Sequence, residues 1–122
     1  MFLSGGVPVY TGCKGTLKSM KTGTIINYPP TGVYGNNQVC QWTISLTIPI
    51  KVKFVGFSLG EICRDYVEIV EFGTKLTLYR RTFCGNNIPV DVHMRNGSFY
   101  VRFFSDGLDV NYGLKILIAR DG

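Results

Sequence analysis

Four cysteines, Cys13, Cys40, Cys63 and Cys84, constrain this chain more than any other feature. Their number is even, no two of them form a CxxC pair, and His93 is the only histidine, so two disulfides are favoured over a zinc site. Because disulfides persist in oxidising compartments, the sequence predicts a protein that works outside the cell. Four cysteines allow three connectivities, and the residues alone do not choose among them.

Length and charge place further bounds on the chain. Its 122 residues suit one domain with a core of its own. Thirteen Lys and Arg against eight Asp and Glu favour acidic partners, such as sulfated glycans, anionic membrane surfaces or acidic protein patches. These cations are scattered, however, and a diffuse excess is more often a solubility feature. No apolar run approaches the roughly 20 residues of a transmembrane helix, and residues 1–10 lack the features of a signal peptide.

Apolar residues recur with a period of two in nearly every segment, which is typical of half-buried strands. Turn residues separate these segments, and Asn96-Gly97 predicts a two-residue hairpin. The fold class predicted is all-β, a two-sheet antiparallel β-sandwich. The core residues expected between the sheets are Trp42, Ile44, Val52, Phe54, Val67, Ile69, Phe99, Val101, Phe103, Leu114 and Ile116.

Side chains that alternate with this core should face outward. Phe104 follows Phe103, so one of the two faces inward and the other outward, and Tyr100 and Leu117 are expected to be exposed as well. A patch built from such residues could bind a partner, although single exposed apolar residues are normal.

Catalysis and nucleic-acid binding have little support. His93 is the only histidine that could serve as a catalytic base, and the sequence contains no G-x-S-x-G element that would supply a nucleophilic serine. The cysteines are better explained as disulfides than as nucleophiles. No glycine-rich loop leads from a strand into a helix, and no basic stripe alternates with stacking aromatics. We therefore predict a protein that is not an enzyme and binds no nucleic acid.

Asn96-Gly97-Ser98 forms an N-glycosylation sequon at the predicted hairpin. Asn-Gly is also explained by the turn alone, so Asn96 is a candidate glycosylation residue rather than an assigned one.

Taken together, the ordered motifs resemble those of the CUB domain family. The match includes Cys13-Lys14-Gly15, Gly23-Thr24-Ile25, Tyr28-Pro29, Tyr34, Asn37, Cys40, Trp42, Phe54, Phe57, Leu59, Cys63, the run from Asp65 to Ile69, Phe83-Cys84-Gly85, Val101, Phe103, Ser105-Asp106 and Gly113. It covers residues 13–120, which leaves residues 1–12 as an N-terminal extension or a segment added for expression. The resemblance implies a jelly-roll-like β-sandwich with Cys13–Cys40 and Cys63–Cys84 bridges. Each bridge would then contribute about 3 kcal/mol on the chain-entropy model.

The resemblance also raises the question of a calcium ion, since many CUB domains hold one with a Tyr, a Glu and two Asp in a region that docks a basic partner residue. Tyr34, Asp65 and Asp106 stand at the matching positions, but Gly60 occupies the usual place of the Glu, with Glu61 one residue later. The short stretch from Leu59 to Cys63 is similar to that of the spermadhesins, CUB proteins that lack the calcium site. We expect no required cofactor and at most weak Ca²⁺ binding by Tyr34, Glu61, Asp65 and Asp106; otherwise Asp65 and Asp106 are loop carboxylates that accept backbone hydrogen bonds.

The function that this resemblance implies is that of a non-catalytic extracellular module binding a protein or a glycan, in a secreted protein or the extracellular part of a membrane protein. Two alternatives remain: an exosite or accessory domain of a secreted protease, and a free-standing spermadhesin-like binder of heparin or carbohydrate. Lys51, Lys53, Arg80 and Arg81 are the candidate basic residues for a sulfated glycan. The oligomeric state stays open.

Overall fold

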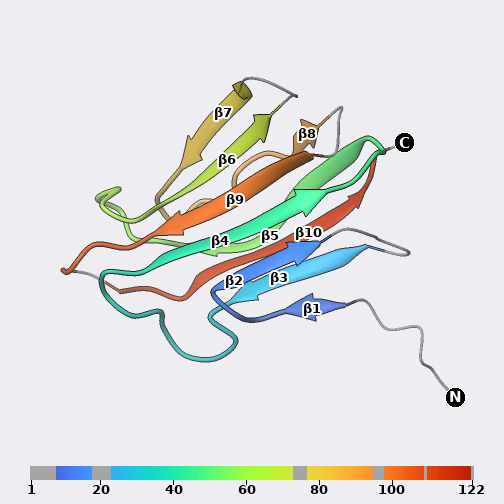
Figure 1. Ribbon diagram of the computed structural model, residues 1–122. Coiled ribbons are helices and arrows are strands. Elements are labelled where there is room, and N and C mark those ends of the chain that lie inside the picture. The colour runs from blue at the N-terminus through green and yellow to red at the C-terminus, as the bar shows by residue number, and fades with distance from the viewer. Residues whose placement is uncertain (1–7, 18–22, 73–76, 95–97, 109, 122) are drawn as a thin grey trace, which may run out of the picture.

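The protein folds into two stacked β-sheets that enclose one core (Figure 1). The computed structural model describes residues 8–17, 23–72, 77–94, 98–108 and 110–121. Within these ranges all regular structure is β-strand, so the predicted all-β sandwich is confirmed.

Sheet A has the strand order β1-β3-β10-β5-β8 and sheet B the order β2-β4-β9-β6-β7. The strands of sheet A are β1 (Val9–Tyr10), β3 (Thr24–Tyr28), β10 (Gly113–Arg120), β5 (Ile50–Ser58) and β8 (Val92–Met94). The strands of sheet B are β2 (Lys14–Leu17), β4 (Val39–Ser45), β9 (Ser98–Phe104), β6 (Tyr66–Phe72) and β7 (Thr77–Phe83).

Most neighbouring strands are antiparallel, as predicted, but each sheet carries one parallel pair at its edge. β1 runs parallel to β3, and β2 runs parallel to β4. The first four strands alternate between the sheets, so β1 pairs with β3 and β2 with β4, and no two consecutive strands among them form a hairpin. The architecture is therefore a mixed sandwich.

The core lies between the sheets and consists of the inward-facing residues of the alternating pattern. All eleven predicted core residues are buried, so the predicted core is confirmed. Phe104, Tyr100 and Leu117 are half-buried on outer faces, while Phe103 is buried. The ring of Phe103 lies edge-on to Tyr34, with centroids 4.7 Å apart.

Phe57 is also buried, although it lies three residues after Phe54 and so breaks the period of two. The pairing of β10 with β5 explains this, because Lys115 pairs with Gly56 and Ile116 with Phe54, which skips Val55. Such a bulge turns the strand so that both phenylalanines face the core. Their rings meet edge-on, with centroids 5.6 Å apart.

The hairpin predicted at Asn96-Gly97 is wrong. Residues 95–97 lie outside the described part of the chain, but the described strands on either side, β8 and β9, belong to different sheets. The Asn-Gly signal is local, whereas strand partners are chosen by packing of the whole sandwich. The sequon residue Asn96 also lies outside the described residues.

The two disulfides join Cys13 to Cys40 and Cys63 to Cys84, with Cα–Cα distances of 4.6 and 5.1 Å. All four cysteines are described and none is free, so the pairing implied by the CUB resemblance is confirmed. Gly113 opens β10 with φ of 93°, and a Cβ there would lie 2.1 Å from the carbonyl oxygen of Tyr28. Only glycine fits that position.

Candidate functional site

One end of the sandwich gathers four connecting segments, which we call the loop end: residues 29–38, 59–65, 84–86 and 105–112 without 109. They come together because β3, β5, β7 and β9 all run toward this end (Figure 1). Tyr34, Glu61, Asp65 and Asp106, the residues predicted for a metal site, all belong to it.

Asp65 is the buried polar centre of the loop end, with 1% of its surface exposed. Its Oδ2 accepts a hydrogen bond of 2.5 Å from the hydroxyl of Tyr34, and its Oδ1 accepts one of 2.9 Å from the backbone N–H of Asp106. Asp106 itself accepts the N–H of Leu108 at 3.0 Å. A buried carboxylate is tolerated only with such donors.

Burial raises the pKa of the Tyr34 hydroxyl well above its usual value, and the hydrogen bond and negative charge of Asp65 raise that pKa further. The phenol therefore stays protonated and donates to Asp65. Tyr34 and Asp65 thus join the segment after β3 to the segment before β6.

Ser105, which is fully buried, joins segment 105–112 to segment 29–38. Its hydroxyl donates to the carbonyl oxygen of Gly35 at 2.8 Å and accepts the N–H of Gln38 at 2.9 Å. Backbone hydrogen bonds join Asn37 to Asp106 and Tyr34 to Asn111. Segments 29–38 and 105–112 are therefore held as one unit.

The other two segments are fixed by a disulfide and an asparagine. Cys63–Cys84 bridges them, and the Oδ1 of Asn86 accepts the N–H of Gly60 at 2.9 Å. The N–H of Leu59 donates to the carbonyl oxygen of Gly85 at 2.9 Å. The short Leu59–Cys63 stretch is thus held by contacts with residues 84–86.

A pocket of about 300 Å³ opens between these segments. It is lined by Leu59, Gly60, Glu61, Ile62, Cys63, Arg64, Asp65, Asn86, Val110 and Asn111. Exposed apolar side chains also gather at the loop end: of the ten large ones exposed in the described residues, five belong to it, namely Val33, Ile62, Leu108, Val110 and Tyr112. Two of these five, Ile62 and Val110, line the pocket.

Ca²⁺ is bound by six to eight oxygen ligands, and the loop end contains the candidate ligands Tyr34, Asp65 and Asp106. Tyr34, Asp65 and Asp106 are linked by hydrogen bonds, as described above. Glu61 is exposed on the pocket wall, and within the described ranges no three Asp, Glu, His or Cys side chains form a group suited to a metal ion.

The four candidate basic residues do not lie on one surface. Lys51 and Lys53 project from β5 on the outer face of sheet A, whereas Arg80 and Arg81 belong to β7, the edge strand of sheet B. Arg80 pairs with Glu68 at 3.5 Å, and the guanidinium of Arg81 lies 4.9 Å from the ring centroid of Phe83. Each pair would have to bind a glycan by itself.

Sequence reasoning missed the exposed apolar residues of the loop end. Leu108, Val110 and Tyr112 are spaced two residues apart, but they and Ile62 lie in connecting segments, where spacing does not say which way a side chain points. A sequence signal was nonetheless present, because large apolar residues in turn-rich segments without a core role are candidates for binding.

Comparison with known proteins agrees with this architecture. A family model described as CUB domain matches residues 13–117. The chain belongs to the CUB domain family.

Relatives and solved structures support this assignment of the CUB domain. Rat cubilin is 33% identical over 89 residues, which cover 69% of this chain and 2% of cubilin. The dorsal-ventral patterning protein tolloid of Drosophila melanogaster is 30% identical over 118 residues, which cover 89% of this chain and 11% of tolloid. The calcium-bound MASP-1 CUB2 domain superposes with a TM-score of 0.65 at 22% identity, covering 96% of this chain and 99% of that domain. The chain thus spans a small part of the curated relatives that it matches.

Domains of the CUB family are generally non-catalytic extracellular modules, and they occur in larger proteins, some of them associated with proteases. Within the described residues, no helix has the length and apolar character needed to cross a membrane.

Proposed function

We propose that this CUB domain is an extracellular protein-binding module whose loop end contacts the partner. The observation that carries the proposal is the concentration of exposed apolar side chains on the loop end, whose segments are fixed by a disulfide and buried hydrogen bonds. Tyr112, for example, is 74% exposed. Large apolar and aromatic side chains on a rigid support are the usual anchors of protein interfaces.

The chemistry of the pocket suits a protein rather than a small cofactor. Ile62 and Val110 offer apolar contact, while Asn86 and Asn111 offer amide groups and Glu61 a carboxylate on the wall. An interface with an apolar centre and a polar rim has this composition. A basic side chain of the partner would meet Glu61 there.

The same surface serves the alternative in which the domain is an accessory part of a secreted protease. In that case the partner is the protease's substrate or regulator, and the chain contributes binding without catalysis. Two relatives motivate this second hypothesis: tolloid and the inactive serine protease PAMR1 of Bos taurus. This chain covers 11% of the first and 14% of the second.

The finer proposal concerns calcium, and it is motivated by the calcium-bound MASP-1 CUB2 domain. Tyr34, Asp65 and Asp106 would be the ligands, with a dissociation constant in the millimolar range of weak extracellular sites. Glu61 joins only if its loop is rearranged. Calorimetric titration of Ca²⁺ into chelator-stripped protein, with Asp106→Ala as the control, tests this. A micromolar site that Asp106→Ala abolishes would contradict the proposal.

The protein-binding proposal is tested with a panel of purified extracellular ectodomains and surface plasmon resonance. We expect at least one ectodomain to bind, and the loop-end variant Ile62→Ser/Val110→Ser/Tyr112→Ser to weaken that binding at least about tenfold. Val55→Ser on β5 is the matched control, since Val55 is exposed on the outer face of sheet A.

Two results would overturn the proposal. One is binding that the loop-end variant leaves unchanged while its thermal unfolding matches the wild type. The other is an equal loss with Val55→Ser, which would mean that any exposed apolar residue contributes.

A further inference from the structure

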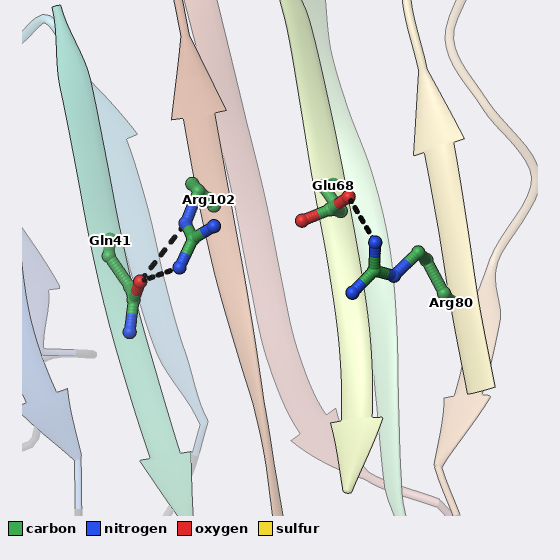
Figure 2. Close-up of polar contacts among 4 residues, drawn as sticks. All are labelled: Gln41, Glu68, Arg80 and Arg102. Carbon is green, nitrogen blue, oxygen red and sulfur yellow. Dashed lines mark hydrogen bonds and ion pairs between the residues drawn. The ribbon is translucent and has the colours of Figure 1, made fainter. Parts of the chain in front are cut away.

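A second surface, unrelated to the loop end, lies on the outer face of sheet B. Strand register places four polar side chains in one row across this face: Lys14 pairs with Gln41, Gln41 with Arg102, and Arg102 with Glu68. All four positions alternate with core residues, so their side chains share the outer face. Figure 2 shows three of them side by side on neighbouring strands, together with Arg80.

The positive charges in this row are not neutralised from within it. Arg102 donates from Nε and Nη2 to the amide oxygen of Gln41, at 3.1 and 2.9 Å, although Glu68 is its register partner on the other side. Glu68 instead pairs with Arg80 (Figure 2). Among the described residues no carboxylate forms an ion pair with Arg102 or Lys14. This face therefore presents two cations to a ligand that carries negative charge.

Beside this row is a depression of about 510 Å³, which we call the β2–β4 depression. It is lined by Lys14, Gly15, Thr16, Gln41 and Thr43. A Cβ at Gly15 would point away from the depression, because it would lie 3.4 Å from Trp42 and 3.5 Å from Tyr10. The depression is therefore shaped by the side chains of Lys14, Thr16, Gln41 and Thr43.

The side chains of the described lining are polar. They carry two hydroxyls, one amide and one ammonium, and none of these described residues is large and apolar. An acidic peptide would be anchored by large apolar side chains, which the described lining does not offer. A saccharide, whose surface consists mainly of hydroxyl groups, matches it better.

Aromatic rings on the same face hold the arrangement in place. The guanidinium of Arg102 lies 4.9 Å from the ring centroid of Tyr100, which pairs in register with Thr43 of the depression. Rings of Tyr66 and Phe104 stack at 5.1 Å with an interplanar angle of 23°. Arg102 is thus fixed by a ring and an amide instead of an acid, which leaves its charge available.

We propose that the β2–β4 depression binds an anionic saccharide. Its sulfate or carboxylate group lies between Lys14 and Arg102, and its ring hydroxyls meet Thr16, Thr43 and Gln41. Arg and Lys are the side chains suited to such anions, and their hydrogen bonds to a charged group are stronger than neutral ones. This surface acts independently of the loop end.

Titration followed by NMR tests the proposal with three probes: a heparin-derived tetrasaccharide, 3′-sialyllactose and neutral lactose. The first two distinguish a sulfate from a carboxylate as the recognised group. We expect at least one of them to bind and to shift the amide signals of β2 and β4, while lactose binds at least about tenfold more weakly.

Substitutions then test whether the saccharide binds at the β2–β4 depression. Lys14→Ala and Arg102→Gln should each reduce the affinity about tenfold. Lys53→Ala is the matched control for Lys14→Ala, because it removes the same charge from an exposed strand position on the opposite face. Arg120→Gln, an exposed position at the end of β10, is the control for Arg102→Gln. Chemical shifts of the free variants check that each one is folded.

Three results would overturn the proposal. The first is that neither anionic probe binds at concentrations up to about 10 mM, which would detect even a weak ligand. The second is that lactose binds as tightly as the anionic probes. The third is that Lys14→Ala and Lys53→Ala lose the same amount of affinity. The last would mean that the probe follows the diffuse positive charge of the domain.

Discussion

The loop end and the outer face of sheet B differ in what holds their exposed side chains in place. At the loop end, buried polar groups fix the segments from below: Asp65, Tyr34 and Ser105 hydrogen-bond beneath a surface that exposes Ile62 and Tyr112. On sheet B, strand register places Lys14, Gln41 and Arg102 above an apolar core. The loop end thus exposes apolar side chains above buried polar groups, whereas the row on sheet B exposes polar side chains above an apolar core.

We infer from this difference that the two surfaces suit different ligands and depend on different interactions. An apolar surface on tied loops suits a protein partner, and a polar surface on rigid strands suits an anion-bearing saccharide. Loss of one buried loop contact should harm the first surface, while the second should survive it.

The largest effect expected at the loop end comes from removing Cys63–Cys84. Changing both residues to Ser should lower the free energy of unfolding by about 2–5 kcal/mol, because the bridge ties segment 59–65 to segment 84–86. Urea unfolding measures the loss. Binding of the ectodomain should fall in the folded protein, while binding of the anionic saccharide stays as in the wild type. Equal loss of both would show that the two surfaces are not independent.

A smaller effect is expected from Tyr34→Phe, which removes the donor to the buried Asp65 carboxylate. At neutral pH we expect a loss of about 1.5–3 kcal/mol in unfolding free energy, as for a hydrogen bond to a charged group. Asp106→Ala, which keeps the backbone donor to Asp65, is the comparison variant.

The stability difference between the wild type and Tyr34→Phe should depend on pH, and its sign follows from the raised pKa of Tyr34. Because the folded-state pKa of Tyr34 is raised, its stabilising effect is complete below the ordinary tyrosine pKa of about 10 and is lost as the pH rises toward the folded-state value. The stability advantage of the wild type over Tyr34→Phe should therefore shrink above about pH 10. An advantage that grows with pH would contradict the assignment of Tyr34 as the donor.

The smallest effect concerns Glu68 on the sheet face. Its pair with Arg80 involves an Arg side chain that is 57% exposed, so Glu68→Gln should change the unfolding free energy by less than about 1 kcal/mol. The variant removes a negative charge beside Arg102 and should raise the affinity for the anionic saccharide about twofold at low salt. Weaker saccharide binding would place the ligand away from this row.

The sequence predicted the sheet regions well because alternation and burial determine them together. Trp42, Phe54 and Val101 could be assigned to the core from a period of two alone. Phe57 was not assigned, since the bulge beside Gly56 depends on how β10 pairs with β5. The Asn96-Gly97 hairpin was wrong for a related reason, because local turn propensity does not choose the sheet that a strand joins.

The loop end was predictable in its residues but not in its arrangement. Tyr34, Asp65 and Asp106 were named from the family pattern, and they do lie together. Their hydrogen bonds depend on backbone conformations such as the positive φ of Asn37 and Cys63, which no periodicity reveals. The exposed apolar residues of the loop end were missed because the spacing of apolar residues outside strands does not show which of them are exposed.

The measurement that tests the account most directly is the affinity of two variants for two ligands. The loop-end variant Ile62→Ser/Val110→Ser/Tyr112→Ser and the sheet variant Lys14→Ala/Arg102→Gln are each titrated with the ectodomain and with the anionic saccharide. We predict that the first loses only the ectodomain and the second only the saccharide, each by at least about tenfold. If either folded variant loses both ligands to the same extent, the two surfaces act as one and the account is contradicted.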